Sequence, residues 1–300
     1  MKKEITFIGL GRMGAAMVTL LSEKGYQVHG YDPSQTARTN ATDAGIQVYQ
    51  TLEDAVHTLD MPRTVWLMVP AKYVDDVIQQ LLPILTKGDT IIDGGNSFFK
   101  DTLRRENELA DSGINYIDCG TSGGVEGARN GASLMVGGEQ NIVEEHAHLF
   151  KDLATENGYG HVGESGAGHF VKMVHNGIEY GMMGAIAEGL NVLHEHKAGL
   201  NLDIIKTLNP YQNGSIIESN LMNWVSEAYH QDGYLAKIAG EVPKGETEME
   251  MEYLISNENV LILEAALAQR KATRKEPSFI GTLISAMRNQ FGGHKIINKK

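Results

Sequence analysis

"ITFIGLGRMGAAM" (residues 5–17) joins a short apolar run to three glycines and then to the start of a helical pattern. Gly9, Gly11 and Gly14 have the spacing G-x-G-x-x-G at this strand-to-helix transition. Glycines so spaced permit a tight turn, close approach to a pyrophosphate and close helix packing, while the helix N-terminus favours the phosphate charge. The stretch predicts a dinucleotide-binding turn made by Gly9, Leu10, Gly11, Arg12, Met13 and Gly14.

Asp32 follows the second apolar run and lies 18 residues beyond Gly14. An acidic residue there can accept hydrogen bonds from the ribose hydroxyls and repels a 2′-phosphate, so Asp32 favours NAD over NADP. Two alternatives remain open at this point. Asp32 could only start the "DPS" turn, and Arg38 could contact a 2′-phosphate, which keeps NADP as a second cofactor.

Short apolar runs alternate with amphipathic segments through the first half of the chain, which predicts a mainly parallel sheet covered on both faces. We expect strands near 5–10, 26–32, 64–70, 89–95, 115–120 and 133–138. Beyond the Gly-rich stretch "NGYGHVGESGAG" (157–168) the strand pattern stops. Helical patterns cover 166–197, 202–208, 213–230, 247–270 and 277–290. The predicted fold is an α/β Rossmann-type doubly wound domain (1–164) followed by an all-α substrate and oligomerisation domain (165–300).

Composition limits the function classes. The 300 residues are 42% hydrophobic, and the net charge of -12 argues against binding nucleic acid or an anionic membrane. Cys119 is the only cysteine, which rules out an intrachain disulfide and a Cys-rich metal site and favours a reducing cytoplasm. We expect no metal. Glu4, Arg12 and the glycines interrupt the N-terminal apolar run, so no targeting segment is predicted.

Three polar or Gly-rich loops follow predicted strands, where ligands bind in doubly wound sheets. They are "MVPAKYVDDV" (68–77), "DGGNS" (93–97) and "DCGTSGGVEGARNG" (118–131). The first two are expected to contact the cofactor through Val69, Pro70 and Asn96. The third offers hydroxyl and backbone donors to an anion, although a plain turn could have the same composition.

"KMVHNGIEY" (172–180) carries polar residues within an apolar helical pattern. Helical spacing collects Lys172, His175, Asn176, Glu179 and Tyr180 on one face. A solvated face, a structural ion pair and a functional seam are three readings of such a stripe. The apolar flanks favour a buried helix, and burying Lys and Glu is costly unless they pair or do chemistry.

Five motifs in the same order make the chain resemble the 6-phosphogluconate dehydrogenase family, and specifically its short form, over essentially its whole length. They are "GLGRMG", "DGGNS", "SGG" (122–124), "KMVHNGIEY" and "RNQFGGH" (288–294). The wider relatives, such as 3-hydroxyisobutyrate dehydrogenase, typically carry Asn-Asn where this chain has His175-Asn176. They also lack a counterpart to "RNQFGGH".

The resemblance implies roles for individual residues. Lys172 matches the general base and Glu179 the general acid, and His175 and Asn176 complete the catalytic set. The other matched substrate-binding residues are Asn96, Ser122, Gly123, Gly124, Tyr180, Arg288 and His294. In the long form of the family the tail residues come from the neighbouring subunit, and this chain is substantially shorter than that form.

The implied reaction is oxidative decarboxylation of 6-phospho-D-gluconate to D-ribulose 5-phosphate and CO2, with NAD the favoured hydride acceptor. Burial promotes the neutral form of a lysine side chain, and only this form can act as a base, because the charged form cannot accept a proton. The resemblance also implies a cytoplasmic homodimer or homotetramer. Three other functions remain open: a related β-hydroxyacid dehydrogenase such as 3-hydroxyisobutyrate dehydrogenase, an imine reductase of the same fold, and a non-catalytic dinucleotide-sensing protein. Lys172 argues against the imine reductase, which normally lacks that lysine.

Overall fold

The computed structural model describes residues 3–196 and 199–299 and divides into two compact units, Met1–Lys172 and Met173–Lys300. The first unit ends inside a long helix, α8 (Ala167–Glu195), whose remainder belongs to the second unit. The domain boundary expected after residue 164 stays a prediction. Each unit is described by itself below.

The first unit alternates strands and helices. Its strands are β1 (Glu4–Ile8), β2 (Gln27–Tyr31), β3 (Gln47–Val48), β4 (Thr64–Leu67), β5 (Thr90–Asp93), β6 (Asn115–Ser122), β7 (Ala132–Gly137) and β8 (Ala154–Gly163). Its helices before α8 are α1 (Arg12–Glu23), α2 (Gln35–Asp43), α3 (Leu52–His57), η1 (Ala71–Tyr73), α4 (Val74–Leu81), α5 (Phe99–Ala110), α6 (Gly124–Asn130) and α7 (Gln140–Leu153).

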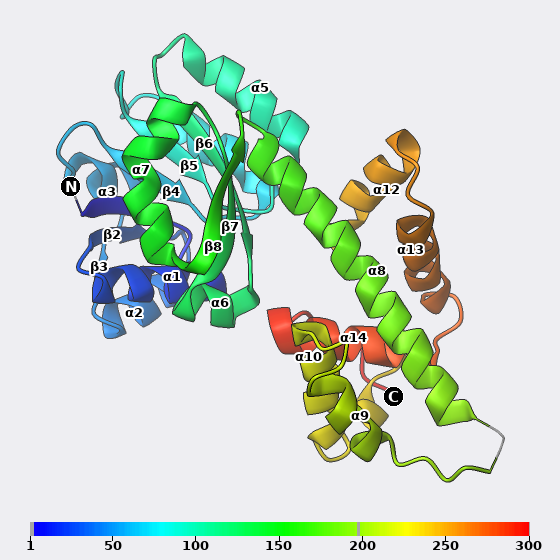
Figure 1. Ribbon diagram of the computed structural model, residues 1–300. Helices are drawn as coiled ribbons and strands as arrows, with labels where there is room; N and C mark the ends of the chain where they lie inside the picture. The colour runs from blue at the N-terminus through cyan, green and yellow to red at the C-terminus, as the bar shows by residue number, and fades with distance from the viewer. Residues whose placement is uncertain (1–2, 197–198, 300) are drawn as a thin grey trace. The chain divides into compact units, whose positions relative to one another are not determined.

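The eight strands form one sheet in the order β3-β2-β1-β4-β5-β6-β7-β8 (Figure 1). Every neighbouring pair is parallel except β6 and β7, which are antiparallel. The chain leaves β1 toward β2 on one side and returns to β4 on the other, so the strand order reverses beside β1. This confirms the predicted doubly wound α/β fold, and it puts the glycine turn after β1 at the reversal point where such folds bind dinucleotides.

Apolar side chains cover both faces of the sheet, which explains why its strands read as nearly continuous hydrophobic runs. On one face, Phe7 and Trp66 pack with Met17 of α1 and Phe150 of α7. On the other face, the strands pack against α3, α4 and α5, including Ile78 of α4. The central strands are therefore rigid, and they hold the loops at their carboxyl ends in fixed positions.

The sequence-based expectation was wrong at the end of this unit. Residues 154–163 form β8, which pairs in parallel with β7, although the sequence analysis treated 157–168 as a Gly-rich connection. β8 is an edge strand and most of it is half-buried or exposed, so it lacks the alternation of apolar residues by which strands are recognised. The sequence pattern predicts helices near 12–24, 36–44, 72–86 and 100–112 in this half, so helices α3, α6 and α7 and the two-residue strand β3 are additional.

In the described part of the second unit, 173–196 and 199–299, the regular elements are the rest of α8 and further helices, as predicted for the C-terminal half. These are α9 (Ile204–Gln212), α10 (Asn220–His230), α11 (Tyr234–Lys237), α12 (Glu248–Asn257), α13 (Leu261–Thr273) and α14 (Phe279–Gly292). The pattern over 247–270 predicted one helix, but the chain forms two, α12 and α13, with a break at residues 258–260. The helix expected over 213–230 begins only at Asn220.

Glycines let α13 pack closely on α8. A Cβ at Gly181 would lie 3.3 Å from a side-chain carbon of Ile262, and one at Gly184 would lie 3.1 Å from Oε1 of Gln269. A larger side chain at Gly181 or Gly184 of α8 would force the neighbouring side chains of α13 to shift. The close approach brings the C-terminal end of α13 against the second half of the polar stripe on α8.

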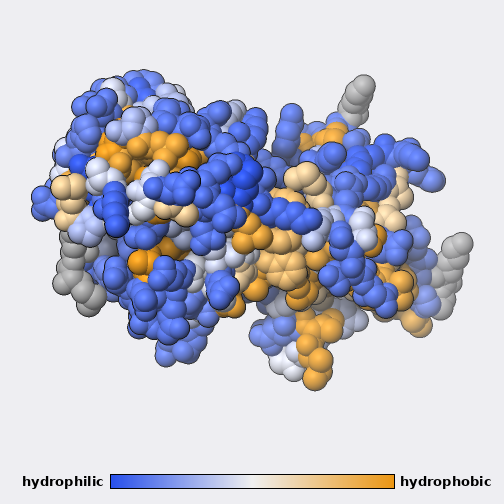
Figure 2. Space-filling view, turned by 90° about the horizontal axis from the view of Figure 1, so that it is seen from above, coloured by the Kyte–Doolittle hydropathy of each residue, from blue (hydrophilic) through white to orange (hydrophobic). Residues whose placement is uncertain are grey.

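Hydrophilic residues cover much of the surface in Figure 2, with hydrophobic residues interspersed. In the second unit, Ile178 of α8 and Leu261 and Ile262 of α13 are exposed, at 55%, 71% and 70% respectively. None of the helices formed by residues 3–196 and 199–299 could span a lipid bilayer as a hydrophobic segment. The predicted homo-oligomer stays a prediction.

Candidate functional site

The glycine turn has the geometry that phosphate binding requires. Gly9 has a φ of +98°, a conformation that L side chains rarely adopt, and a Cβ at Gly14 would collide with the carbonyl oxygen of Gly9. A Cβ at Gly11 would meet nothing within 4 Å. Gly11 is also the N-cap of α1, which has no side-chain cap and no acidic residue in its first turn. Backbone N–H groups at a helix N-terminus form a common binding site for an anion.

Asp32 connects the end of β2 to the glycine turn. Its carboxylate accepts hydrogen bonds from the backbone N–H of Leu10, at 2.8 Å, and from that of Ser34, also at 2.8 Å. Arg38 points back to the same turn: its guanidinium donates to the carbonyl oxygens of Asp32 at 2.6 Å and Pro33 at 3.1 Å. Arg38 also donates to the side chain of Gln35 at 2.7 Å. The contact of Asp32 with the cofactor ribose stays a prediction.

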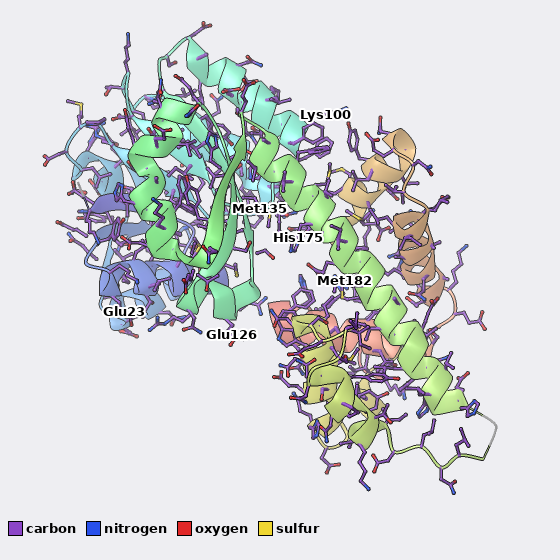
Figure 3. All side chains as sticks on the ribbon, viewed as in Figure 1. Glu23, Lys100, Glu126, Met135, His175 and Met182 are labelled. Carbon is purple, nitrogen blue, oxygen red and sulfur yellow. The ribbon has the colours of Figure 1, made fainter. Side chains whose placement is uncertain are left out.

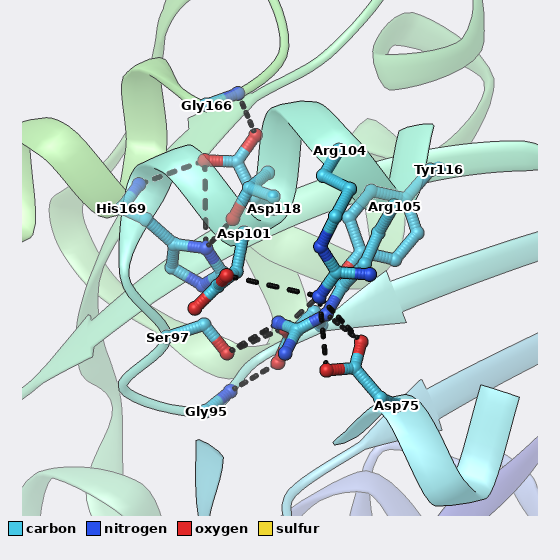
Figure 4. A network of polar contacts seen from close by, with 12 residues as sticks. Asp75, Gly95, Ser97, Asp101, Arg104, Arg105, Tyr116, Asp118, Gly166 and His169 are labelled. Atoms are coloured by element: carbon cyan, nitrogen blue, oxygen red, sulfur yellow. Dashed lines mark hydrogen bonds and ion pairs between the residues drawn. The ribbon is translucent and has the colours of Figure 1, made fainter. Parts of the chain in front are cut away.

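A buried polar network supports the loop that follows β5 (Figure 4). Asp93 is fully buried and accepts hydrogen bonds from the Gly95 N–H at 3.1 Å, the Ser97 hydroxyl at 2.7 Å and the Tyr116 hydroxyl at 3.0 Å. Arg105 lies 3.4 Å from Asp93. These bonds fix both sides of Asn96, the residue expected to contact substrate and cofactor.

Arg105 also connects this loop to helix α4. Its Nε donates to Asp75 at 2.8 Å, and the neighbouring Arg104 contacts the same carboxylate at 2.9 Å. Burial opposes the charged form of Arg105, but the hydrogen bond to Asp75 and the charge of Asp93 outweigh it and raise the pKa. The loops after β4 and β5 are therefore held by one charged side chain.

The loop after β6 contains two consecutive glycines with positive φ angles. Gly123 is the N-cap of α6 with a φ of +118°, and Gly124 has a φ of +62°. Successive N–H groups in such a turn can point into one concavity. Thr121 is tied to the loop after β5 by a hydrogen bond of 3.2 Å from its hydroxyl to the Gly94 carbonyl.

Asp118 fastens the beginning of α8 to β6. Its two carboxylate oxygens accept hydrogen bonds of 2.7 Å each from the backbone N–H groups of Gly166 and His169 (Figure 4). The His169 ring in turn lies 2.7 Å from the hydroxyl of Thr102 in α5. A negative charge at a helix N-terminus is favourable, and here it is fully buried. The first turn of α8 is therefore fixed against the sheet.

Lys172 is placed by this anchor. It follows one turn after His169 and is 9% exposed. A Cβ at Gly120 of β6 would collide with the Lys172 side chain, so glycine there makes room for the lysine stem.

Helix α8 carries all five residues of the polar stripe, with His175 labelled in Figure 3. Lys172, Asn176 and Tyr180 are buried, and His175 and Glu179 are half-buried. A solvated face is therefore excluded. In the second unit, the Asn176 amide donates to the carboxylate of Glu250 in α12, which is itself buried, at 3.1 Å.

Two buried arginines lie near Tyr180 within the second unit. The guanidinium carbon of Arg270 is 3.2 Å from the centre of the Tyr180 ring, a cation–π contact, and the Tyr180 hydroxyl bonds to that of Thr247. Arg288 donates to the carbonyl oxygen of Pro243 at 3.1 Å. Across the described part of the chain, neither arginine has a carboxylate within salt-bridge distance.

The electrostatics of this pair favour an anion. Burial lowers the pKa of Arg270 to about 10, and the charge of Arg288 contributes in the same direction. Burial likewise lowers the pKa of Arg288. The charge of Glu179 opposes this shift at both arginines, and that of Glu248 opposes it at Arg288. Desolvated cations of this kind can form charge-assisted hydrogen bonds with an anion.

His294 lies just beyond the C-terminal end of α14, the helix that carries Arg288. Its backbone N–H donates to the Arg288 carbonyl at 3.4 Å, and its ring packs edge-on against Phe291 at 5.6 Å between centroids. Within residues 3–196 and 199–299, no cluster of His, Cys, Asp or Glu has the arrangement of a metal site. Cys119 is a fully buried β6 residue, and burial raises the pKa of its thiol.

Sequence reasoning missed several residues that the structure brings to these positions. Asp118 and Asp93 are carboxylates at the ends of apolar strand runs, which is a signal that could have been noticed. Arg270 carried no motif, because a single arginine in an amphipathic helix is usually exposed. Glu250 and Thr247 depend on the turn that precedes α12, and local sequence pattern does not reveal their contacts.

Two models of one known protein family match segments of this chain. Residues 4–163 match a family model described as the NAD binding domain of 6-phosphogluconate dehydrogenase, and residues 168–207 match one for the C-terminal domain of that enzyme. YqeC of Bacillus subtilis is 40% identical over 293 residues, covering 97% of this chain and 98% of that protein.

A protein of Haloferax volcanii named NAD(+)-dependent, decarboxylating 6-phosphogluconate dehydrogenase is 38% identical over 302 residues, covering 99% of each chain. Among solved structures, Plasmodium falciparum 6-phosphogluconate dehydrogenase is similar with a TM-score of 0.81 and 28% identity, covering 90% of this chain and 62% of that one. That enzyme is described in complex with NADP+ and with 6-phosphogluconate.

Proposed function

Because the chain belongs to the 6-phosphogluconate dehydrogenase family, we propose that it oxidatively decarboxylates 6-phospho-D-gluconate to D-ribulose 5-phosphate, with NAD as the preferred acceptor. The observation that carries the proposal is the pair of buried arginines, Arg270 and Arg288, near Tyr180. A small unphosphorylated hydroxyacid would bring no phosphate to these buried cations. A sugar acid with a terminal phosphate would bring one.

The residues of the first unit fit a nicotinamide dinucleotide. The pyrophosphate would be held by the N–H groups after Gly11 at the N-terminus of α1, and the adenosine ribose by Asp32. When bound, NAD accepts the hydride released from the alcohol carbon of the substrate. Val69, Pro70 and Asn96 would contact it from the loops after β4 and β5.

Lys172 starts the chemistry in this proposal. Its neutral amine takes the proton of the C3 hydroxyl as that carbon is oxidised to a ketone. The resulting ammonium then donates a hydrogen bond to the ketone oxygen, which receives the electron pair when the bond from C2 to the carboxyl carbon breaks and CO2 leaves. Lys172 returns its proton to that oxygen to give the enediol. No metal is needed for this polarisation.

Glu179 completes the sequence by protonating the carbon that lost CO2, which gives the ketose. It follows Lys172 by two turns of α8, and a rigid helix keeps such a spacing better than a loop does. His175 and Asn176 lie between the two along the chain and would hold the sugar hydroxyls. Asn96, Ser122, Gly123 and Gly124 would hold the carboxylate end, and His294 would contribute from the tail.

The assignment is tested by initial rates of reduced-nicotinamide formation. We expect 6-phosphogluconate to be oxidised and NAD to be preferred over NADP. Unphosphorylated gluconate should react with a much higher KM, because it brings no phosphate to Arg270 and Arg288. Turnover of 3-hydroxyisobutyrate in place of 6-phosphogluconate would instead identify a small-acid dehydrogenase. Cofactor binding without turnover of either acid would indicate a dinucleotide sensor.

A further inference from the structure

The C-terminal segment of the chain folds back onto its own unit. Beyond α14, Asn298 pairs with Ile238 as an antiparallel bridge, and the Ala239 N–H donates to the Ile297 carbonyl at 2.8 Å. The Lys299 N–H donates to the Lys237 carbonyl at 2.7 Å. The segment is thus attached to the loop after α11 of the same chain.

Helix α14 is fastened to the same unit along its length. The Ser285 hydroxyl donates to the Glu241 carbonyl at 3.0 Å, and the Tyr234 hydroxyl donates to the Asn289 side chain at 2.6 Å. Ala286 is fully buried in a small cluster with Ala228 and Ile238. Carrying α14 to another subunit would break all of these contacts.

Arg288 therefore meets its neighbours within one chain. A Cβ at Gly245 would lie 3.0 Å from Nη2 of Arg288 and 3.8 Å from the Tyr180 hydroxyl, so both groups converge on the backbone at Gly245. The charge of Arg288 also lowers the pKa of Arg270, whose guanidinium lies over the Tyr180 ring. The glycine leaves room at the point where these groups meet.

From this convergence we infer that each chain completes the phosphate-binding end of its own site, with Arg288 acting in cis. The inference rests on the proposed function and differs from what the long-form resemblance implies, where the matching tail residue comes from a neighbouring subunit. A chain that keeps Arg288 beside its own Tyr180 needs no partner to bind the phosphate, whatever its oligomeric state.

The test is complementation between two defective chains. Lys172→Met and Arg288→Met chains carrying different tags are co-expressed, and mixed oligomers are isolated by tandem purification and identified by native mass spectrometry. Rates are measured with 6-phosphogluconate well below the wild-type KM, where we expect Arg288→Met alone to lose about 10- to 100-fold. A mixed oligomer of Lys172→Met and wild-type chains is the positive control.

If Arg288 acts in cis, every site in the mixed oligomer carries one lesion, and its rate does not exceed that of the defective chains alone. Full activity of a monomeric wild-type chain would support the inference equally. Recovery of about half the rate per mixed dimer, matching the positive control, would show that the tail acts in trans and overturn it. Arg288→Lys, which keeps the charge, should retain more activity than Arg288→Met and so separates lost charge from misfolding.

An inactive wild-type enzyme would count against the proposed function instead. In that case the same chains are compared by inorganic phosphate binding, measured calorimetrically in monomer and oligomer fractions. Binding by the wild-type monomer that is lost in Arg288→Met retains the cis inference. Binding only by oligomers contradicts it.

Discussion

Lys172 combines burial with a fixed backbone position. The anchor from Asp118 to Gly166 and His169 holds the helix start, and Gly120 makes room for the lysine stem. We predict that Lys172→Met lowers kcat by about 10²- to 10⁴-fold, the usual worth of a general base. Methionine fills a similar volume, so the dissociation constant for NAD should stay within a factor of two, roughly. A variant that keeps most of its kcat would exclude Lys172 as the base.

Asp32 is expected to decide between the two cofactors. Asp32→Ala should raise the ratio of kcat/KM for NADP to that for NAD, because a 2′-phosphate would no longer meet a carboxylate. Asp32→Asn is the matched control, since its amide oxygen can still accept the hydrogen bond from Leu10 while the charge is gone. An unchanged ratio in both variants would mean that another residue, such as Arg38, discriminates.

Arg270 should reduce the stability of the ligand-free protein. Its lowered pKa, about 10 against 12.5, corresponds to a cost of roughly 3 kcal/mol for keeping the buried cation charged at neutral pH. Arg270→Met should therefore raise the Tm of the ligand-free protein while increasing KM for 6-phosphogluconate by about 10- to 100-fold.

The neighbouring Lys271 provides the control for this prediction. It forms a half-exposed salt bridge with Glu252, and Lys271→Met should change stability by less than about 1 kcal/mol and leave KM unchanged. Thermal unfolding with and without substrate distinguishes the two variants. A lower Tm of Arg270→Met together with an unchanged KM would assign Arg270 a purely structural role.

At the scale of elements, the sequence was informative where local pattern and tertiary structure agree. The strand-turn-helix at Gly9 to Gly14 and the helix bearing Lys172 were both predicted, because apolar periodicity and glycine spacing are local signals. β8 was not, since its residues pair on one side only and face solvent along much of their length. The break between α12 and α13 interrupts a continuous helical pattern, and tertiary packing decides it.

Residues that support the site were the least predictable part. Arg105 lies in a helix of charged residues, "KDTLRREN", where nothing local separates it from the exposed Arg104. Only the folded chain shows that Arg105 is 2% exposed and in contact with Asp75 and Asp93. Such roles come from long-range contacts, which a single sequence does not encode in any short window.

Arg104 and Arg105 allow a matched experiment. Arg105→Met should lower the free energy of unfolding by about 3–5 kcal/mol, because it leaves the buried Asp93 carboxylate without its cation, and should reduce kcat/KM through the loop that carries Asn96. Arg104→Met removes an exposed partner of Asp75 and should cost less than about 1 kcal/mol. Urea unfolding compares them, and equal losses in the two variants would refute the supporting role of Arg105.

At the scale of the whole molecule, a Rossmann-type sheet domain is followed by a helical unit that contains the buried arginines Arg270 and Arg288. Lys172 and Glu179, the residues proposed as base and acid, both lie on helix α8. The family comparison covers nearly the full length of the Haloferax volcanii relative, which supports the same reaction for this chain.

The most direct measurement follows 6-phosphogluconate labelled with ¹³C at C1 by NMR while reduced nicotinamide is recorded in the same sample. The account predicts one labelled CO2 and one unlabelled ribulose 5-phosphate for each hydride transferred, with a deuteron from D2O at C1 of the product where Glu179 acts. Reduced cofactor that accumulates while the label stays in a six-carbon acid would contradict the central claim.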